Sequence, residues 1–149
     1  MSDKVNEIKI SYNGGVKSKH WVRISSSSDA AVILFNKWDK RTIELQECFK
    51  MILLNNSNKV KGICQISQGG LTGTIVDLRI LFATVLKSLS VGIILAHNHP
   101  SGKLKPSTND IQLTEKVKNA ASFFDIKLLD HLILAPDGDY YSFADSGIL

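Results

Sequence analysis

The chain has 149 residues, of which 44% are hydrophobic and 21% are charged. This composition is that of one soluble globular domain and excludes a disordered chain. The apolar stretches, such as 91–96, are too short to span a bilayer, and the N-terminus lacks the apolar core of a secretory signal. We therefore expect a cytoplasmic protein that does not enter the membrane.

Charge and cysteine content argue against two kinds of site. Residues 1–61 carry 11 basic and 6 acidic side chains, whereas residues 62–149 carry 7 and 8. No clustered stripe of Lys and Arg accompanies this mild basic bias, so a dedicated nucleic-acid-binding surface is not indicated. Cys48 and Cys64 do not have the spacing of a disulfide framework or a zinc knuckle, and Cys48 is expected to be a buried free thiol.

The first 26 residues are predicted to form a short extension, followed by one main domain over residues 27–149. Within the extension, the run 19–24 is typical of a short strand. Serines at 25–28 and Asp29 then give a helix N-cap signal, and apolar residues recur at helical spacing behind them, across 30–38. This junction is the expected boundary between extension and domain.

The remainder of the chain alternates strands and helices. Residues 47–55 and 59–66 are predicted strands, and the turn signal Asn-Asn-Ser-Asn between them predicts an antiparallel hairpin. Glycines at 69, 70 and 73 mark a loop. An amphipathic helix with Asp77 near its start is then predicted from the spacing of Leu78, Leu81, Phe82, Val85, Leu86 and Leu89. A strand at 91–97, a helix at 107–124 and strands at 126–135 and 140–143 complete an α/β fold, in which helices flank a mixed sheet.

Two histidines stand where the chemistry is expected, at the end of the apolar strand 91–97. His97 and His99 are two residues apart, and in extended chain such residues point to the same side. A Pro-Ser-Gly turn follows, so both imidazoles lie at an edge of the sheet, where α/β proteins open their sites. The pair can therefore converge on one point.

A carboxylate is expected to join the two histidines. The chain enters a helix at Ser107, which places Asp110 in the first helical turn, from where it can face back toward His97 and His99. Two imidazoles and one carboxylate leave one tetrahedral position for water, the usual arrangement of a catalytic zinc. Zinc lowers the pKa of a bound water to about 7, so that it becomes a nucleophile at neutral pH.

Each of these residues also has a purely structural interpretation. The histidines can be hydrogen-bonded polar groups at a strand end. Ser107 and Asp110 form the pattern S-x-x-D of a helix capping box, which is compatible with metal binding. The coincidence of all four residues within one short window favours the metal site.

The wider sequence pattern resembles a known family. His-x-His, seven residues, Ser, two residues and Asp match the JAMM motif of the MPN-domain metallopeptidases, the JAB/JAMM superfamily. The strings HNHPSG, PSTND, LLDH and YYSF resemble the bacterial RadC-like branch, specifically over 91–110 and more loosely from about 27 to 149. The resemblance implies an MPN-type fold similar to that of cytidine deaminases, with zinc bound by His97, His99 and Asp110. Longer RadC-like proteins match only in their C-terminal half and carry a helical N-terminal region linked to DNA, for which the first 26 residues here are too short.

The same resemblance implies two catalytic residues. The motif serine, which helps to hold the oxyanion, falls on Ser107. The family also uses an upstream glutamate as general base, and Glu47, at the start of the apolar run 48–54, sits where RadC-like sequences carry theirs. Glu44 is the alternative for this role, and an exposed carboxylate at a strand end is the structural interpretation of Glu47.

Asp130 and His131 are adjacent on a predicted strand and must point to opposite faces of the sheet. One of them could approach the metal site, because metal-bound imidazoles usually donate their second N–H to an acceptor. We favour the other interpretation, a surface pair or a hydrogen-bonded pair in the core.

Three functions are consistent with the sequence. The first is a zinc hydrolase of the amide or isopeptide class that acts on a peptide or protein, with Glu47 as base and Ser107 as oxyanion donor. The second is a non-catalytic MPN binding module, which usually loses ligands that are all present here. The third is a metal-dependent enzyme acting on nucleic acid, for which the sequence lacks a platform of aromatic and basic side chains. The substrate and the oligomeric state are left open.

Overall fold

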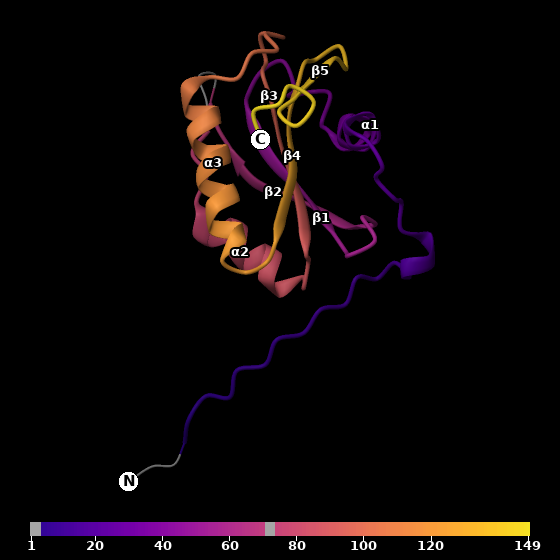
Figure 1. Cartoon of the computed structure of the whole chain (residues 1–149), viewed down its shortest axis with the longest axis vertical. Helices are drawn as coiled ribbons and strands as arrows, with labels where there is room; N and C mark the ends of the chain where they lie inside the picture. Colours follow the sequence, from indigo (N-terminus) through magenta and orange to yellow (C-terminus); the bar gives the residue numbers. More distant parts are fainter. Residues whose placement is uncertain (1–3, 71–73) are drawn as a thin grey trace.

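The computed structural model describes residues 4–70 and 74–149 and shows an α/β fold with a five-stranded mixed sheet (Figure 1). The sheet order is β2-β1-β3-β4-β5. The strands are β1 (Cys48–Leu54), β2 (Val60–Gln68), β3 (Gly92–Asn98), β4 (Lys127–Leu134) and β5 (Tyr140–Ser142). The helices are α1 (Ser27–Lys37), α2 (Leu78–Lys87) and α3 (Thr108–Ser122), preceded by one short 3-10 turn at Ser18–His20. This architecture confirms the predicted fold class.

The helices cover both faces of the sheet. Side chains of successive strand residues alternate between the faces, so one strand serves two apolar layers. Ile52 and Leu54 of β1 pack with α1, whereas Phe49, Met51 and Leu53 pack with α2 and α3. In Figure 1, α1 accordingly lies on the opposite side of the sheet from α2 and α3.

Strand β3 lies in the middle of the sheet and carries the two histidines to its edge. All seven of its residues are buried, because helices cover both faces and strands flank both sides. It pairs antiparallel with β1 and parallel with β4, and α3 provides the crossover between the parallel strands. The carboxyl end of β3 and the first turn of α3 therefore come to the same end of the sheet.

The predicted hairpin is confirmed. Strands β1 and β2 pair antiparallel, with Met51 opposite Cys64 and Ile52 opposite Ile63. Asn58 in the connecting turn adopts a positive φ of 58°, a conformation that asparagine tolerates better than most residues. Both cysteines are free, and Cys48 is buried as expected.

Two predicted elements differ from the structure. Only residues 19 and 20 of the predicted strand 19–24 lie in a 3-10 turn, and the rest is irregular except for a single bridge that joins Arg23 to Lys59. The apolar stripe of α2 is shorter than its spacing indicates, because the helix ends at Lys87 and Leu89 adopts a φ of 54°. Leu89, beyond the helix, is 67% exposed, and Leu86, in its last turn, is 44% exposed. Gly73 of the predicted loop lies outside the described residues.

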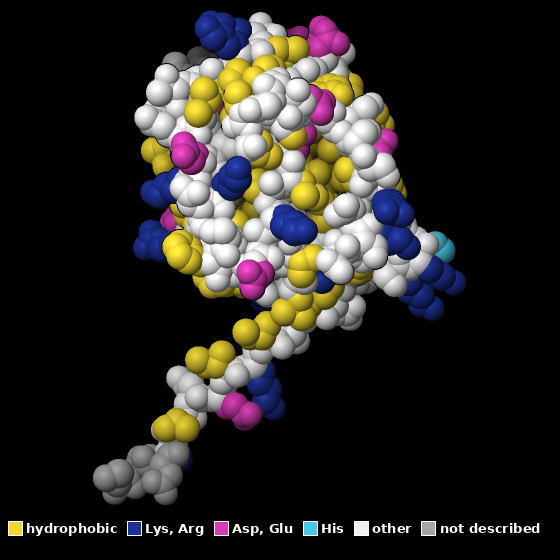
Figure 2. Space-filling view, in the orientation of Figure 1, with side chains coloured by type: hydrophobic (Ala, Val, Ile, Leu, Met, Phe, Trp, Pro, Cys, Tyr) yellow, Lys and Arg dark blue, Asp and Glu magenta, His cyan; other side chains and the backbone are white. Residues whose placement is uncertain are grey.

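The N-terminal segment reaches away from the folded body (Figures 1 and 2). Val5, Ile8 and Ile10 are highly exposed, whereas Ile24 is buried against the α1 side of the core. The boundary at residues 26 and 27 stays a prediction. Across 4–70 and 74–149, the helices are too short or too polar to cross a membrane.

Candidate metal centre

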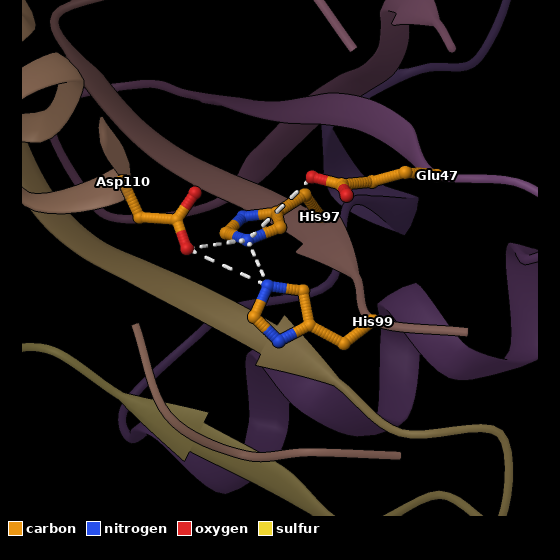
Figure 3. Close-up of side chains that lie close together, drawn as sticks. All are labelled: Glu47, His97, His99 and Asp110. Atoms are coloured by element: carbon orange, nitrogen blue, oxygen red, sulfur yellow. Dashed lines mark hydrogen bonds and ion pairs between the residues drawn. The ribbon is translucent and has the colours of Figure 1, made fainter. Parts of the chain in front are cut away.

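Four side chains from three separate segments meet at one end of the sheet (Figure 3). His97 and His99 come from the end of β3, Asp110 from the first turn of α3, and Glu47 from the residue before β1. Because Phe49 pairs with His97, Glu47, two residues earlier, reaches the same edge and the same face. One ligand atom from each of the four residues lies within 4.8 Å of every other.

The closest approach is between the two imidazoles. His97 Nε2 lies 3.0 Å from His99 Nε2, and Asp110 Oδ2 lies 3.4 Å from the first and 3.5 Å from the second. Glu47 Oε1 stands slightly farther away, 4.0 Å from His97 Nε2. Glu47 thus borders the three other groups, while Glu44, the alternative from the sequence, is exposed and outside the cluster.

The donor chemistry of this cluster suits a cation. His99 Nδ1 lies 2.6 Å from the carbonyl oxygen of Lys103, and because a carbonyl can only accept, Nδ1 must donate. The neutral ring then turns the lone pair of Nε2 toward His97 and Asp110. Acceptors that face one another at these distances are stabilised by a positive charge between them, so the group can hold a metal ion.

Burial and charge shift the protonation of the cluster. Burial opposes ionisation of Asp110, but its interaction with the imidazoles of His97 and His99, which can carry positive charge, outweighs burial and holds the pKa of this carboxyl well below its usual range. The Asp110 carboxylate stabilises the protonated form of the His99 ring and so raises the pKa of His99. Half-burial raises the pKa of Glu47, and the positive charge that His97 and His99 can carry opposes part of that rise.

The cluster lies between the interior and an open cleft. The side chain of His97 is only 1% exposed, whereas those of Glu47, His99 and Asp110 retain 16–18% exposure. The cleft has a volume of about 610 Å³. It is lined by the three partly exposed members of the cluster and by Thr74, Pro100, Ser101, Lys103, Lys105, Pro106, Ser107, Thr108 and Asn109. The cleft therefore connects the cluster to solvent.

Comparison with known proteins identifies the domain. The family model described as RadC-like JAB domain matches residues 24–148. The chain belongs to the RadC-like JAB domain family. A UPF0758 protein of Flavobacterium johnsoniae is 48% identical over 127 residues, 85% of this chain and 53% of that protein. A UPF0758 protein of Porphyromonas gingivalis is 46% identical over 104 residues, which are 70% of this chain and 46% of that protein. One of Clostridium kluyveri is 41% identical over 127 residues, which are 85% of this chain and 54% of that protein.

The chain spans about half the length of these curated relatives. The match confirms the family that the HNHPSG and PSTND strings indicate. The metal ligands and catalytic roles of individual residues in this RadC-like JAB domain stay proposals.

Ser107 caps α3 and borders the cleft of the RadC-like JAB domain. Its Oγ accepts from the backbone N–H of Asp110 at 3.0 Å, and its own N–H donates to Asp110 Oδ2 at 2.8 Å. This is the capping box that the sequence predicts. Asp110 Oδ2 therefore serves the helix start and faces the histidines at the same time.

Asn98, between the two histidines, has a role that the sequence analysis missed. Strand alternation turns it to the other face, where its Oδ1 accepts from the N–H of Cys48 at 2.7 Å. Its Nδ2 donates to the carbonyls of Ile43 at 2.8 Å and Gln46 at 2.9 Å. Asn98 thereby anchors the segment that carries Glu47. A buried asparagine in an apolar strand is a signal for such bonds, but its partners lie about 50 residues away.

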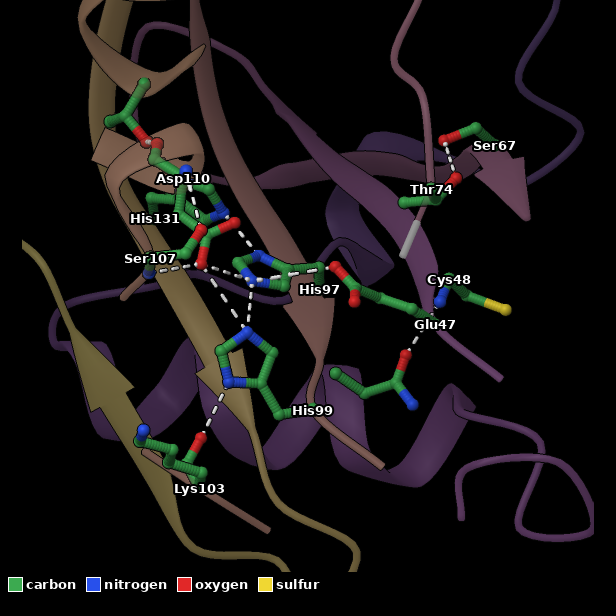
Figure 4. A network of polar contacts seen from close by, with 12 residues as sticks. Glu47, Cys48, Ser67, Thr74, His97, His99, Lys103, Ser107, Asp110 and His131 are labelled. Carbon is green, nitrogen blue, oxygen red and sulfur yellow. Dashed lines mark hydrogen bonds and ion pairs between the residues drawn. The ribbon is translucent and has the colours of Figure 1, made fainter. Parts of the chain in front are cut away.

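Behind the cluster, His131 contacts His97 directly (Figure 4). His131 and Asp130 are both buried and hydrogen-bonded, as in the core-pair interpretation. His131 also meets the other expectation, because its Nε2 lies 2.8 Å from His97 Nδ1. Asp130 faces away and accepts from Ser142 Oγ at 2.6 Å and from the N–H of Ala144 at 3.0 Å.

Proposed function

We propose that this domain is a zinc-dependent hydrolase of the amide or isopeptide class, with His97, His99 and Asp110 as metal ligands. The observation that carries the proposal is the convergence of two imidazole nitrogens and a carboxylate oxygen at 3.0–3.5 Å beside an open cleft. Three ligands of these types with a fourth position left to solvent are the usual set of a catalytic zinc site. Membership of the RadC-like JAB domain family supports the same activity.

The proposed roles of the chain's own side chains follow from their positions. Zinc, when bound, supplies a Lewis acid that acidifies a coordinated water. Glu47 stands beside the three ligands without crowding them, and its raised pKa suits a carboxylate that accepts a proton from water and passes it to the leaving amine. The Ser107 hydroxyl borders the same cleft and is proposed to donate its proton to the oxyanion of the substrate.

The cleft supports a peptide or protein substrate. It is open and lined by small polar side chains, by the prolines Pro100 and Pro106 and by the lysines Lys103 and Lys105. A non-catalytic binding module would not need a general base beside the metal ligands. Substitution of Glu47 therefore distinguishes an enzyme from a binding module.

The first prediction concerns metal content. Protein purified without chelators should contain about one zinc per chain after dialysis, because the ligands are held in place before the metal arrives. Elemental analysis by mass spectrometry measures this directly. The double variant His97→Ala, His99→Ala should contain none, while His20→Ala, which changes an exposed histidine outside the cluster, should match the wild type. Equal metal in the wild type and the double variant would refute the ligand assignment.

A further inference from the structure

A chain of hydrogen bonds leads from α3 through the core to His97. It begins at Thr114, whose Oγ1 lies 2.6 Å from the backbone carbonyl oxygen of Asp110. Two oxygens at this distance require a proton between them, and the carbonyl has none to give. The Thr114 hydroxyl therefore donates its single proton to the backbone carbonyl of Asp110.

The next member of the chain is His131. Its Nδ1 lies 2.6 Å from Thr114 Oγ1, and because the hydroxyl proton is already committed, Nδ1 must be the donor. The imidazole is fully buried, stacked on Phe143 at 4.6 Å and edge-on to Phe49 at 5.6 Å. A ring in such apolar surroundings is neutral, so Nε2 carries a lone pair.

The last bond reaches the cluster itself. His131 Nε2 lies 2.8 Å from His97 Nδ1, and since Nε2 has only a lone pair to offer, His97 Nδ1 must donate. In this tautomer the lone pair of His97 is on Nε2, the atom that faces His99 and Asp110. The opposite tautomer would direct an N–H into the cluster and block it.

We propose that Thr114 and His131 form a relay that fixes the tautomer of His97, so that its Nε2 lone pair is presented to the metal. Both are positioning residues, because neither touches the cleft. The relay starts at the backbone of Asp110, so the helix that supplies the carboxylate ligand also sets the protonation pattern of an imidazole ligand. His99 needs no such relay, since the Lys103 carbonyl sets its tautomer directly.

This inference rests on the proposed function for its consequence, but the tautomer can be measured without metal. Long-range ¹H–¹⁵N spectra of the metal-free wild type should show His97 and His131 protonated at Nδ1. Zinc affinity is then measured by competition with a chromophoric chelator. Thr114→Val keeps the shape of the side chain and removes the hydroxyl, so it should shift both tautomers and weaken zinc binding by roughly 10- to 100-fold.

Two matched variants separate the relay from general effects. Thr114→Ser restores the hydroxyl and should recover wild-type tautomers and affinity. Thr84→Val removes the corresponding hydroxyl bond to Ile80 in α2, remote from the cluster, and should leave both measurements unchanged.

The relay is overturned by a His97 that is protonated at Nε2 in the metal-free wild type. It is equally overturned by Thr114→Val protein with wild-type tautomers or wild-type zinc affinity. A wild type that binds no zinc refutes the proposed function instead, and the spectrum of the metal-free protein still decides the tautomer.

Discussion

The carboxylate of Asp110 belongs to two groups at once, because the same oxygen, Oδ2, accepts from the N–H of Ser107 and lies 3.4 Å from His97 Nε2. A capping interaction thus holds a proposed metal ligand in place in the metal-free protein. Glu47 differs from Asp110, because within residues 4–70 and 74–149 no hydrogen bond fixes its side chain, and Oε1 lies 4.0 Å from His97 Nε2. This difference agrees with the proposed roles of Asp110 as a metal ligand and of Glu47 as a proton carrier.

We predict that substitution of Glu47 separates zinc binding from catalysis. Glu47→Gln should keep the fold and the zinc, because the proposed ligands are untouched. Hydrolysis of any substrate should fall by roughly 10²- to 10⁴-fold, the contribution of a positioned base. Turnover and metal content are measured on the same preparation, with Glu44→Gln as the exposed control. Full activity in Glu47→Gln would show that another group is the base or that the domain is a binding module.

Ser107 is predicted to have two separable roles. As N-cap it stabilises α3, and Ser107→Ala should cost about 1 kcal/mol of the free energy of unfolding. As oxyanion donor it should matter more for rate, with a loss on the order of 10²- to 10³-fold in turnover. Capping uses a lone pair and oxyanion binding uses the proton, so one hydroxyl can do both.

Ser107→Asp tests the separation. It should restore the cap and the stability while it stays inactive, because a carboxylate accepts hydrogen bonds but has no proton to donate. Thermal unfolding and turnover are compared across the wild type, Ser107→Ala and Ser107→Asp. Wild-type turnover in Ser107→Asp would leave Ser107 as a cap alone.

Among the elements, those governed by local rules could be predicted from the sequence. The S-x-x-D cap of α3, the β1–β2 hairpin and the His-x-His strand end depend on residues close together in the chain, and all appear in the structure. The stripe of α2 was predicted too long, because periodicity persists to Leu89 while the backbone leaves the helix after Lys87. The partners of Asn98 could not be predicted, and the contact of His131 with His97 was only one of two open interpretations, since these contacts exist only once distant segments are brought together.

Asn98 gives a prediction at this scale, because it ties β3 to the segment before β1. Asn98→Ala leaves the N–H of Cys48 without its buried acceptor and two carbonyls without their donor. The free energy of unfolding should fall by about 3 kcal/mol, as for other losses of a buried hydrogen-bond network. Denaturant unfolding measures the change, with the exposed Asn36→Ala in α1 as control, expected within about 0.5 kcal/mol of the wild type. Equal stability of the two variants would contradict the anchoring role.

Across the whole molecule, the cluster joins segments that are far apart in the sequence at one end of the sheet. The residue before β1, the end of β3 and the start of α3 each contribute, and β3 is the buried central strand of the sheet. A ligand that binds this folded arrangement and not the unfolded chain stabilises it.

The most direct test of the metal assignment is anomalous diffraction at the zinc absorption edge from crystals grown with zinc. The account predicts one strong peak at the end of β3, about 2.0–2.2 Å from His97 Nε2, His99 Nε2 and Asp110 Oδ2, with Glu47 outside the ligand set. A peak bound by other residues, or no peak at this cluster in zinc-containing crystals, would contradict it.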